Sequence, residues 1–333
     1  MASIPSHMKG VVINKTGGTD VLEYKTDLPI PKLKDGQVLV RNQFVGVNYI
    51  DTYFRSGLYP TPSFPYMLGR EAEGVVVSIP AGTETHDFKE GDRVVYLCEA
   101  TYAEYTAANA AKVVRIPEKV PVKVGAAALL QGLTALTLIK ETYNVQKGDW
   151  VLVHAAAGGV GLLLCQLLRA VGAKTIATAS TEEKRQLAKE NGANVTVGYE
   201  EEDVKKVVKE HTDGEGVKAV FDGVGKATFD LSLDVLARKG TLASFGSASG
   251  AVAPLTITRL SAKNAKVARP TLFNYIFTRE EFDLYTEQLL DFIAKGELNI
   301  RIHEVYPLTE IARAHNDIQG RGTTGKLLID PTK

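Results

Sequence analysis

Residues 150–171 read WVLVHAAAGGVGLLLCQLLRAV, an apolar strand that runs through a glycine-rich turn into an apolar helix. The turn at 156–161 is Ala-Ala-Gly-Gly-Val-Gly, which matches the dinucleotide-binding fingerprint with alanine in the first glycine position. Gly158 would let the backbone approach a pyrophosphate, and Gly161 would let the helix pack closely on the strand. Because the N–H groups at the start of the helix would receive the phosphates, the turn predicts a bound dinucleotide.

Strands and helices alternate on both sides of this turn. From Val124 the apolar spacing becomes helical, through 126–143, and the alternation then continues to about residue 270. The expected strands are 150–156, 174–179, 194–199, 217–223 and 240–246, and the helices expected between them are 160–173, 182–193, 201–212 and 226–240. Such alternation is typical of parallel strands with helices on both faces, so this part predicts an α/β fold with a Rossmann doubly wound parallel sheet.

The first third of the chain has a different pattern, in which short β-branched runs are separated by glycine and proline clusters. The expected strands are 11–14, 37–47, 73–79 and 92–97. With no helices expected between them, they predict an antiparallel or barrel-like domain. A helix within 279–298, a strand around 304–308, a helix through 311–318 and a strand at 326–331 are expected to pack back onto that domain.

Composition narrows the class of protein. The chain has 333 residues, with 39 basic and 39 acidic side chains, so its formal net charge is zero. A neutral protein has no net electrostatic attraction to nucleic acid or acidic membranes. Its length predicts about two domains. Its two cysteines, Cys98 and Cys165, form no disulfide framework or zinc pattern. With no signal-like N-terminus and no apolar stretch long enough to span a membrane, the sequence predicts a cytoplasmic protein.

The tip of the second Rossmann strand indicates which coenzyme is bound. Enzymes that use NAD place an acidic residue there, whereas this tip reads Ala-Thr-Ala-Ser-Thr at 177–181. Ser180 can donate a hydrogen bond to a 2′-phosphate, and Lys184 can supply a positive charge. The tip therefore favours NADPH, unless Glu182 or Glu183 points inward. A surface position for Lys184 is the alternative.

Other catalytic patterns are missing or misplaced. The six histidines form no i, i+4 pair, so no metal site is predicted. His154 is read as a packed core imidazole. Tyr143 and Lys147 have the spacing of the Tyr-x-x-x-Lys pair of short-chain reductases, but they precede the glycine turn and are read as a helix end. No Gly-x-Ser-x-Gly elbow indicates a hydrolase.

Several further segments resemble one family. They are GVNYIDTYFRSGLYP at 46–60, LGREAEGVV at 68–76, AAAGGVG, FDGVG at 221–225, SFGSASGA at 244–251, ARP at 268–270 and GKLLI at 325–329. Over nearly its whole length the chain resembles the zeta-crystallin-like NADPH:quinone oxidoreductases, which are zinc-free medium-chain dehydrogenase/reductases. The resemblance implies a GroES-like catalytic domain from residues 1–133 and 271–333 around a Rossmann NADP-binding domain, 134–270, with the active site in the cleft between them.

The resemblance also implies site residues. Asn48, Asp51 and Tyr53 would be catalytic and would line the site where nicotinamide and substrate meet, although Asp51 can also be read as a helix cap and Tyr53 as core. The implied cofactor-binding residues are Tyr49, Ile50, Asp51, Thr134, Gly158, Gly159, Val160, Ser180, Lys184, Tyr199, Gly223, Phe245, Ser247, Pro270, Leu272 and Arg321. The family often has serine where Gly223 stands, so at that position a backbone contact is expected instead.

The function that follows is NADPH-dependent, metal-free reduction of small quinones by a homodimeric enzyme, with Tyr53 or a water as a hypothetical proton donor. Reduction of the double bond of a 2-alkenal or enone is the closest alternative, because it uses the same cofactor and scaffold. A third reading is an NADPH-responsive, crystallin-like structural protein or binder of AU-rich RNA. The neutral charge and the missing aromatic RNA-binding motif argue against RNA as the main partner.

Overall fold

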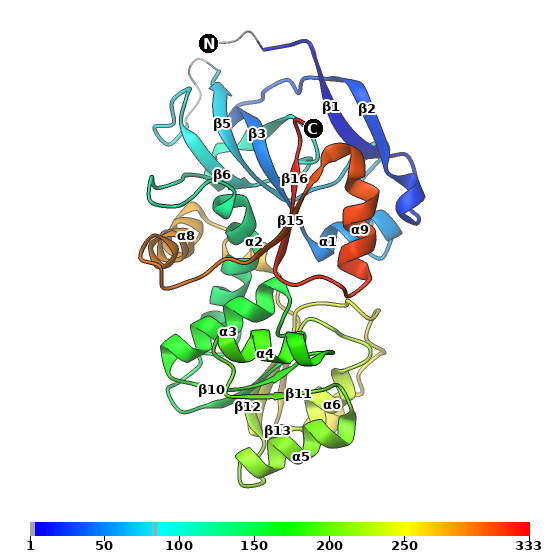
Figure 1. Ribbon diagram of the computed structural model, residues 1–333, viewed down its shortest axis with the longest axis vertical. Helices are drawn as coiled ribbons and strands as arrows, with labels where there is room; N and C mark the ends of the chain where they lie inside the picture. Colours follow the sequence, from blue (N-terminus) through cyan, green and yellow to red (C-terminus); the bar gives the residue numbers. More distant parts are fainter. Residues whose placement is uncertain (1–3, 81, 83–84) are drawn as a thin grey trace. The chain divides into compact units, whose positions relative to one another are not determined.

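The computed structural model describes residues 4–80, 82 and 85–333. The chain divides into two compact units, one of Met1–Leu130 with Thr278–Lys333 and the other of Gln131–Phe277. The sequence placed the divisions at 133/134 and 270/271. In Figure 1 the second unit is the part drawn from green to gold, and each unit is described by itself below.

The second unit is built on a six-stranded parallel sheet in the order β11-β10-β9-β12-β13-β14. Its strands are β9 (Trp150–Val153), β10 (Lys174–Thr178), β11 (Val195–Val197), β12 (Val217–Asp222), β13 (Leu236–Ser244) and β14 (Lys266–Ala268). Numbered along the chain this is the order 3-2-1-4-5-6 of the Rossmann fold, which confirms the predicted fold class. Val151, Leu152 and Val153 of the central strand are fully buried, as expected where both faces of a sheet are covered.

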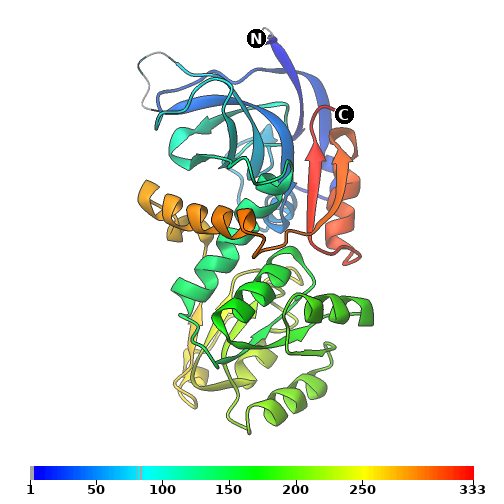
Figure 2. The ribbon, with the colours of Figure 1, turned by 60° about the vertical axis from the view of Figure 1, so that its left-hand side comes forward.

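Helices on both faces cover this sheet (Figures 1 and 2). They are α3 (Gly159–Val171), α4 (Glu182–Glu190), α5 (Glu201–His211) and α6 (Phe229–Asp234), and the short η4 (Ile257–Leu260) and α7 (Leu272–Tyr275) follow β13 and β14. The chain leaves α3 through Gly172 in a left-handed conformation that suits glycine (φ 82°). One expectation is wrong here, because α6 ends at Asp234 and β13 already begins at Leu236, inside the helix expected over 226–240.

The first unit is mostly antiparallel. Its strands are β1 (His7–Ile13), β2 (Glu23–Pro29), β3 (Gln37–Val47), β4 (Tyr66–Met67), β5 (Glu71–Ser78), β6 (Arg93–Leu97), β7 (Tyr105–Asn109), β8 (Val113–Arg115), β15 (Ile302–Pro307) and β16 (Lys326–Asp330). A three-stranded sheet has the order β2-β1-β4, and a larger sheet has the order β15-β16-β3-β5-β6-β8 with β7 also paired to β3. The C-terminal strand β16 pairs with β3, so the end of the chain does return to this unit.

The helices of the first unit are α1 (Tyr49–Ser56), α8 (Arg279–Ala294) and α9 (Ile311–Gln319), with short turns η1 (Thr19–Val21), η2 (Ala110–Lys112) and η5 (Leu308–Glu310). Helix α1 corrects the expectation of strands without intervening helices, because it lies between β3 and β4. Its ends are well defined: a capping box joins Asn48 and Asp51 at the start, and Gly57 (φ 82°) ends it.

Helix α2 (Val124–Thr137) continues into the π-helical turn η3 (Leu138–Thr142), and the division between the two units falls within α2. Contrary to expectation, the stretch Val124–Thr142 is long and apolar enough to cross a membrane by length and composition alone. However, 72% of its most apolar window is buried inside the protein, as in the core helix of a folded chain.

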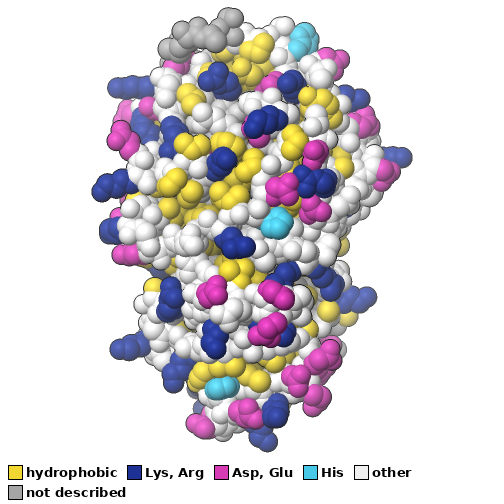
Figure 3. Space-filling view, viewed as in Figure 1, with side chains coloured by type: hydrophobic (Ala, Val, Ile, Leu, Met, Phe, Trp, Pro, Cys, Tyr) yellow, Lys and Arg dark blue, Asp and Glu magenta, His cyan; other side chains and the backbone are white. Residues whose placement is uncertain are grey.

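On the face drawn in Figure 3, basic and acidic side chains are interspersed, in keeping with the zero net charge.

Candidate active site

The glycine turn connects β9 to α3. Gly158 is the N-cap of α3, and Ala155 adopts a left-handed conformation (φ 52°) before it. A Cβ at Gly161 would lie 2.5 Å from Ala155 O and 2.6 Å from Ala156 Cα, so only glycine allows this approach of helix and turn. At Gly158 a Cβ would lie 3.2 Å from Ala155 O, a tight contact, and at Gly159 it would collide with Gln131 Oε1, so both positions favour glycine. The first N–H groups of α3, which lack intrahelical acceptors, therefore follow a turn in which three glycines carry no side chain.

The tip of β10 carries the groups predicted to choose the coenzyme. Ser180 is exposed just beyond the strand, and Lys184 is half-buried in the first turn of α4, where partial burial lowers its pKa. The two glutamates that could have opposed a 2′-phosphate are turned to solvent. Glu182 is mostly exposed and forms a 2.7 Å ion pair with Arg185, and Glu183 is fully exposed. Arg185, which the sequence analysis missed, also donates to Ala179 O at the strand tip.

Buried polar groups connect the strand ends behind this tip. His154 Nδ1 lies 2.9 Å from Thr178 Oγ1, and its Nε2 lies 3.1 Å from Ser232 Oγ, which in turn donates to Asp222. Burial lowers the pKa of His154, which is 2% exposed, so the core imidazole expected from the sequence is confirmed. The ring of Tyr199 stacks on it at a centroid distance of 6.5 Å. Tyr199 is thus held close to the ends of β9 and β10.

The remaining predicted nucleotide residues follow β12 and β13. Gly223 and Phe245 are neighbours, because a Cβ at Gly223 would lie 2.9 Å from the Phe245 ring. Ser247 is 8% exposed, and its Oγ accepts from Arg269, which also donates to Ser244 O and Gly246 O. Arg269 was missed, although it lies in the quoted ARP segment. Pro270 follows Arg269, Leu272 begins α7, and Thr134 is half-buried on α2.

Helix α1 places an aromatic cluster in the first unit. The ring of Tyr53 lies 5.7 Å from that of Tyr49 and 5.1 Å from that of Tyr59, which the sequence analysis had not singled out. Burial raises the pKa of Tyr49, and the charge of Arg321 counteracts this shift, which places Arg321 near Tyr49. Ile50 is half-buried on the same helix. The structure therefore brings the predicted residues of this unit together around one helix.

Asn48 is committed to a buried polar cluster. Its Oδ1 accepts from Lys326 Nζ at 2.6 Å, and its Nδ2 donates to Glu71 Oε1 at 2.9 Å. Lys326 and Glu71 also form an ion pair, and their side chains are 2% and 0% exposed. Both ends of the Asn48 amide are therefore occupied by protein groups, which gives Asn48 a structural part that the sequence analysis did not foresee. The catalytic part predicted for it stays a prediction.

Asp51 is also fully buried and serves as the helix cap that the sequence analysis had kept as an alternative. Its Oδ2 accepts from Asn48 N at 2.9 Å and from Tyr102 Oη at 2.8 Å. Its Oδ1 accepts no hydrogen bond from any residue that the structure describes. Burial raises the pKa of Asp51 to about 6, although the Asn48 N–H, Tyr102, Arg70 and Lys326 all act to lower it.

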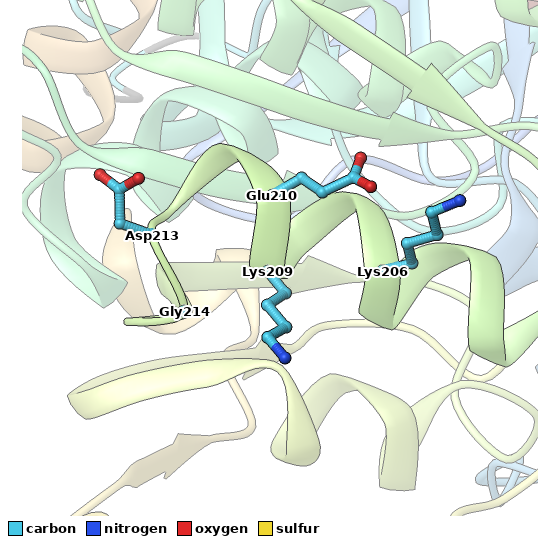
Figure 4. Close-up of a pocket in the computed structure, with 5 residues that line it drawn as sticks. All are labelled: Lys206, Lys209, Glu210, Asp213 and Gly214. Carbon is cyan, nitrogen blue, oxygen red and sulfur yellow. The ribbon is translucent and has the colours of Figure 1, made fainter.

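Other features add no chemistry. Among residues 4–80, 82 and 85–333, no group of three or more His, Cys, Asp or Glu side chains could hold a metal ion. Tyr143 is the C-cap of η3 and donates to Asp149, so its reading as a helix end is confirmed. A hollow of about 450 Å³ lies at the C-terminal end of α5. Figure 4 shows that the charged side chains lining it, from Lys206 to Asp213, point in different directions and do not converge on one point.

Two family models match the two kinds of fold. The model described as "Zinc-binding dehydrogenase" matches residues 159–295, and the model described as "Alcohol dehydrogenase GroES-like domain" matches residues 34–118. Together with the sheet order and the glycine turn, they define a medium-chain dehydrogenase/reductase.

Individual relatives narrow this class. A Schizosaccharomyces pombe protein named "Probable quinone oxidoreductase" is 49% identical over 96% of both chains. The solved Escherichia coli quinone oxidoreductase complexed with NADPH superposes with a TM-score of 0.92 at 39% identity, covering 97% of this chain and 100% of that one. A Burkholderia 2-haloacrylate reductase is 36% identical over 96% of this chain and 98% of its own. The chain belongs to the zinc-free quinone oxidoreductases of the medium-chain dehydrogenase/reductase superfamily.

The pKa of Asp51 predicts a pH dependence of stability. Because this pKa is raised in the folded protein, the stability that Asp51 contributes is complete below 3.8 and is lost as pH rises through about 6. Asp51→Asn has the same shape and does not titrate. We expect its free energy of unfolding, relative to wild type, to increase by about 2 to 3 kcal/mol between about pH 4 and pH 7. Urea unfolding of both proteins across this range measures the difference, and a difference that stays constant would contradict it.

Proposed function

We propose that this protein is an NADPH-dependent reductase of small quinones. The tip of β10 is the observation that carries the choice of coenzyme. A hydroxyl and a lysine lie there, and the neighbouring glutamates are paired with Arg185 or turned to solvent. Membership in the quinone oxidoreductase family supports the choice of substrate.

The residues of the second unit fit a dinucleotide. The backbone of Gly158, Gly159 and Val160 would hold the pyrophosphate at the start of α3. Ser180, Lys184 and Tyr199 would surround the 2′-phosphate and adenine. The residues that would border the ribose and nicotinamide are Thr134, Gly223, Phe245, Ser247, Pro270 and Leu272. When bound, NADPH supplies a hydride from C4 of its nicotinamide, and the protein orients it and excludes water.

The aromatic cluster on α1 would contact the quinone. Tyr49 is half-buried, and a quinone ring would stack on it. Tyr53 is 8% exposed and packs against Tyr49 and Tyr59, in agreement with its alternative reading as a core residue. Arg321 would complete this end of the site. A quinone that accepts a hydride also needs a proton on its reduced oxygen, and the Tyr53 hydroxyl or a water would supply it. An electron-poor quinone needs little further activation. Asn48 and Asp51, which are buried, would act by holding α1 in place.

Lys184 provides a test of the coenzyme assignment. Lys184→Ala removes a charge that would pair with the 2′-phosphate, so KM for NADPH should rise about tenfold or more while KM for NADH changes little. Lys189→Ala, at the exposed end of the same helix, is the matched control and should change neither value. Steady-state kinetics with both coenzymes measures the effect. Equal changes for NADPH and NADH in Lys184→Ala would remove the basis for the phosphate site.

The reaction itself is tested with a panel of acceptors. With saturating NADPH, simple ortho- and para-quinones should have higher kcat/KM than 2-alkenals or enones, because a quinone needs no strong general acid. The measurement is the consumption of NADPH at 340 nm with each acceptor. A strong preference for the alkenal would replace the quinone assignment.

Reduction of an activated carbon–carbon double bond is the second candidate. The observation that favours it is the 36% identity with the 2-haloacrylate reductase, over 96% of the chain. The same cofactor-binding residues would serve both reactions. The aromatic cluster of Tyr49, Tyr53 and Tyr59 favours the flat quinone as the first choice.

We also propose that the enzyme is a cytoplasmic homodimer of the zeta-crystallin type, joined through its Rossmann sheets. Strand β14 supports this arrangement, because it pairs with β13 and ends the sheet at that side. Light scattering of the purified protein should give twice the chain mass of 36.0 kDa. A monomer at micromolar concentration would contradict the proposal.

A further inference from the structure

A chain of hydrogen bonds joins four buried side chains in the first unit. Arg55 Nη1 lies 3.2 Å from His315 Nδ1, His315 Nε2 lies 3.0 Å from Tyr102 Oη, and Tyr102 donates to Asp51 Oδ2 at 2.8 Å. All four residues are at most 4% exposed. They come from α1, α9 and the segment after β6, so these hydrogen bonds connect elements that are far apart in the sequence.

The hydrogen bonds that join these four side chains can be donated in only one direction. A guanidinium has no acceptor, so Arg55 must donate and His315 Nδ1 must accept. The proton of the neutral imidazole is then on Nε2, which donates to Tyr102 Oη, and Tyr102 has its own proton left for Asp51. Burial and the charge of Arg55 lower the pKa of His315 to about 3, so the imidazole stays neutral. All of these hydrogen bonds are therefore donated in one direction, from the Arg55 guanidinium toward the Asp51 carboxylate.

This series of hydrogen bonds ends at the first turn of α1, where Asp51 accepts from Asn48 N and caps the helix. We propose that Tyr102 and His315 are positioning residues for the reaction, which hold the Asp51 carboxylate against the start of α1 and so keep Tyr49 and Tyr53 in their working positions. This inference rests on the proposed function, since it assigns those two tyrosines to the substrate. Neither Tyr102 nor His315 belongs to the residues predicted from the sequence.

The charge on Asp51 is set by groups on every element around it. Arg70 before β5 and Lys326 on β16 favour the carboxylate, and Tyr102 and the Asn48 N–H donate to it. The burial of Asp51 opposes them and leaves its pKa at about 6. Glu71 and Arg55 face the hydroxyl of Tyr102, and the pKa of that hydroxyl is raised, first by burial. Protonation of Asp51 would weaken its acceptance of the Asn48 N–H, because ionised acceptors make the stronger hydrogen bonds.

The test compares Tyr102→Phe with wild type in the full-length protein, with NADPH and a simple quinone. Wild-type kcat/KM should fall on the acid side with an apparent pKa near 6. In Tyr102→Phe the carboxylate loses a donor, so the acid limb of the pH profile should move up by about one pH unit or more. Tyr96→Phe is the matched control, because Tyr96 is equally buried in this unit and donates to Asn42 at 2.5 Å.

His315 provides a second, independent variant. His315→Leu removes the group that donates to Tyr102 Oη but leaves the Tyr102–Asp51 hydrogen bond, so it should move the acid limb in the same direction as Tyr102→Phe and by less. His315→Gln keeps one acceptor and one donor and should restore the wild-type profile. If Tyr102→Phe and Tyr96→Phe lose similar thermal stability but neither moves the acid limb, Tyr102 is merely structural and the inference is overturned. Wild-type protein that consumes no NADPH with any quinone would instead refute the proposed function, and the inference with it.

Discussion

The free-energy cost of burying charged side chains determines which elements of the first unit are joined to α1. A carboxylate in a protein interior needs a cation or several donors nearby. Glu71 is compensated by Lys326 and Asn48, and Asp51 by Tyr102 and the Asn48 N–H. Asn48 belongs to both groups, so the start of α1 is tied to β5 and to the C-terminal strand β16. A lysine from near the end of the chain thus determines where a helix near its beginning can lie.

The second unit meets the same constraint at the carboxyl ends of its strands. Asp222 is fully buried and accepts from the N–H groups of Val224 and Gly225 and from two hydroxyls. Through Ser232 this network reaches His154, on which Tyr199 stacks. Buried polar groups therefore fix the loops at the sheet edge where dinucleotides bind in such folds.

The two units differed in how far the sequence could predict them. The parallel strands are buried on both faces, so Val151–Val153 and its counterparts give continuous apolar runs that stand out. The boundary between α6 and β13 was missed because exposed, polar Arg238 and Lys239 lie inside the strand, where Lys239 adopts a left-handed conformation (φ 66°). Helix α1 was not among the expected helices, because it is only eight residues long and only Asn48, Asp51 and Gly57 indicate its ends. The partners of Glu71 and Tyr102 lie 255 and 213 residues away, beyond any local pattern.

The cost of burying Asp51 argues for its function. An ionised carboxylate with one oxygen lacking any described partner lowers stability at neutral pH, since its pKa is raised and not lowered. Many residues can cap a helix from the surface at no such cost. This protein keeps the charge of Asp51 buried and supports it with the series of hydrogen bonds that begins at Arg55. Part of its folding free energy is therefore used to fix the first turn of α1. Residues that lower stability in this way concentrate at functional sites, and helix α1 carries the two tyrosines assigned to the substrate.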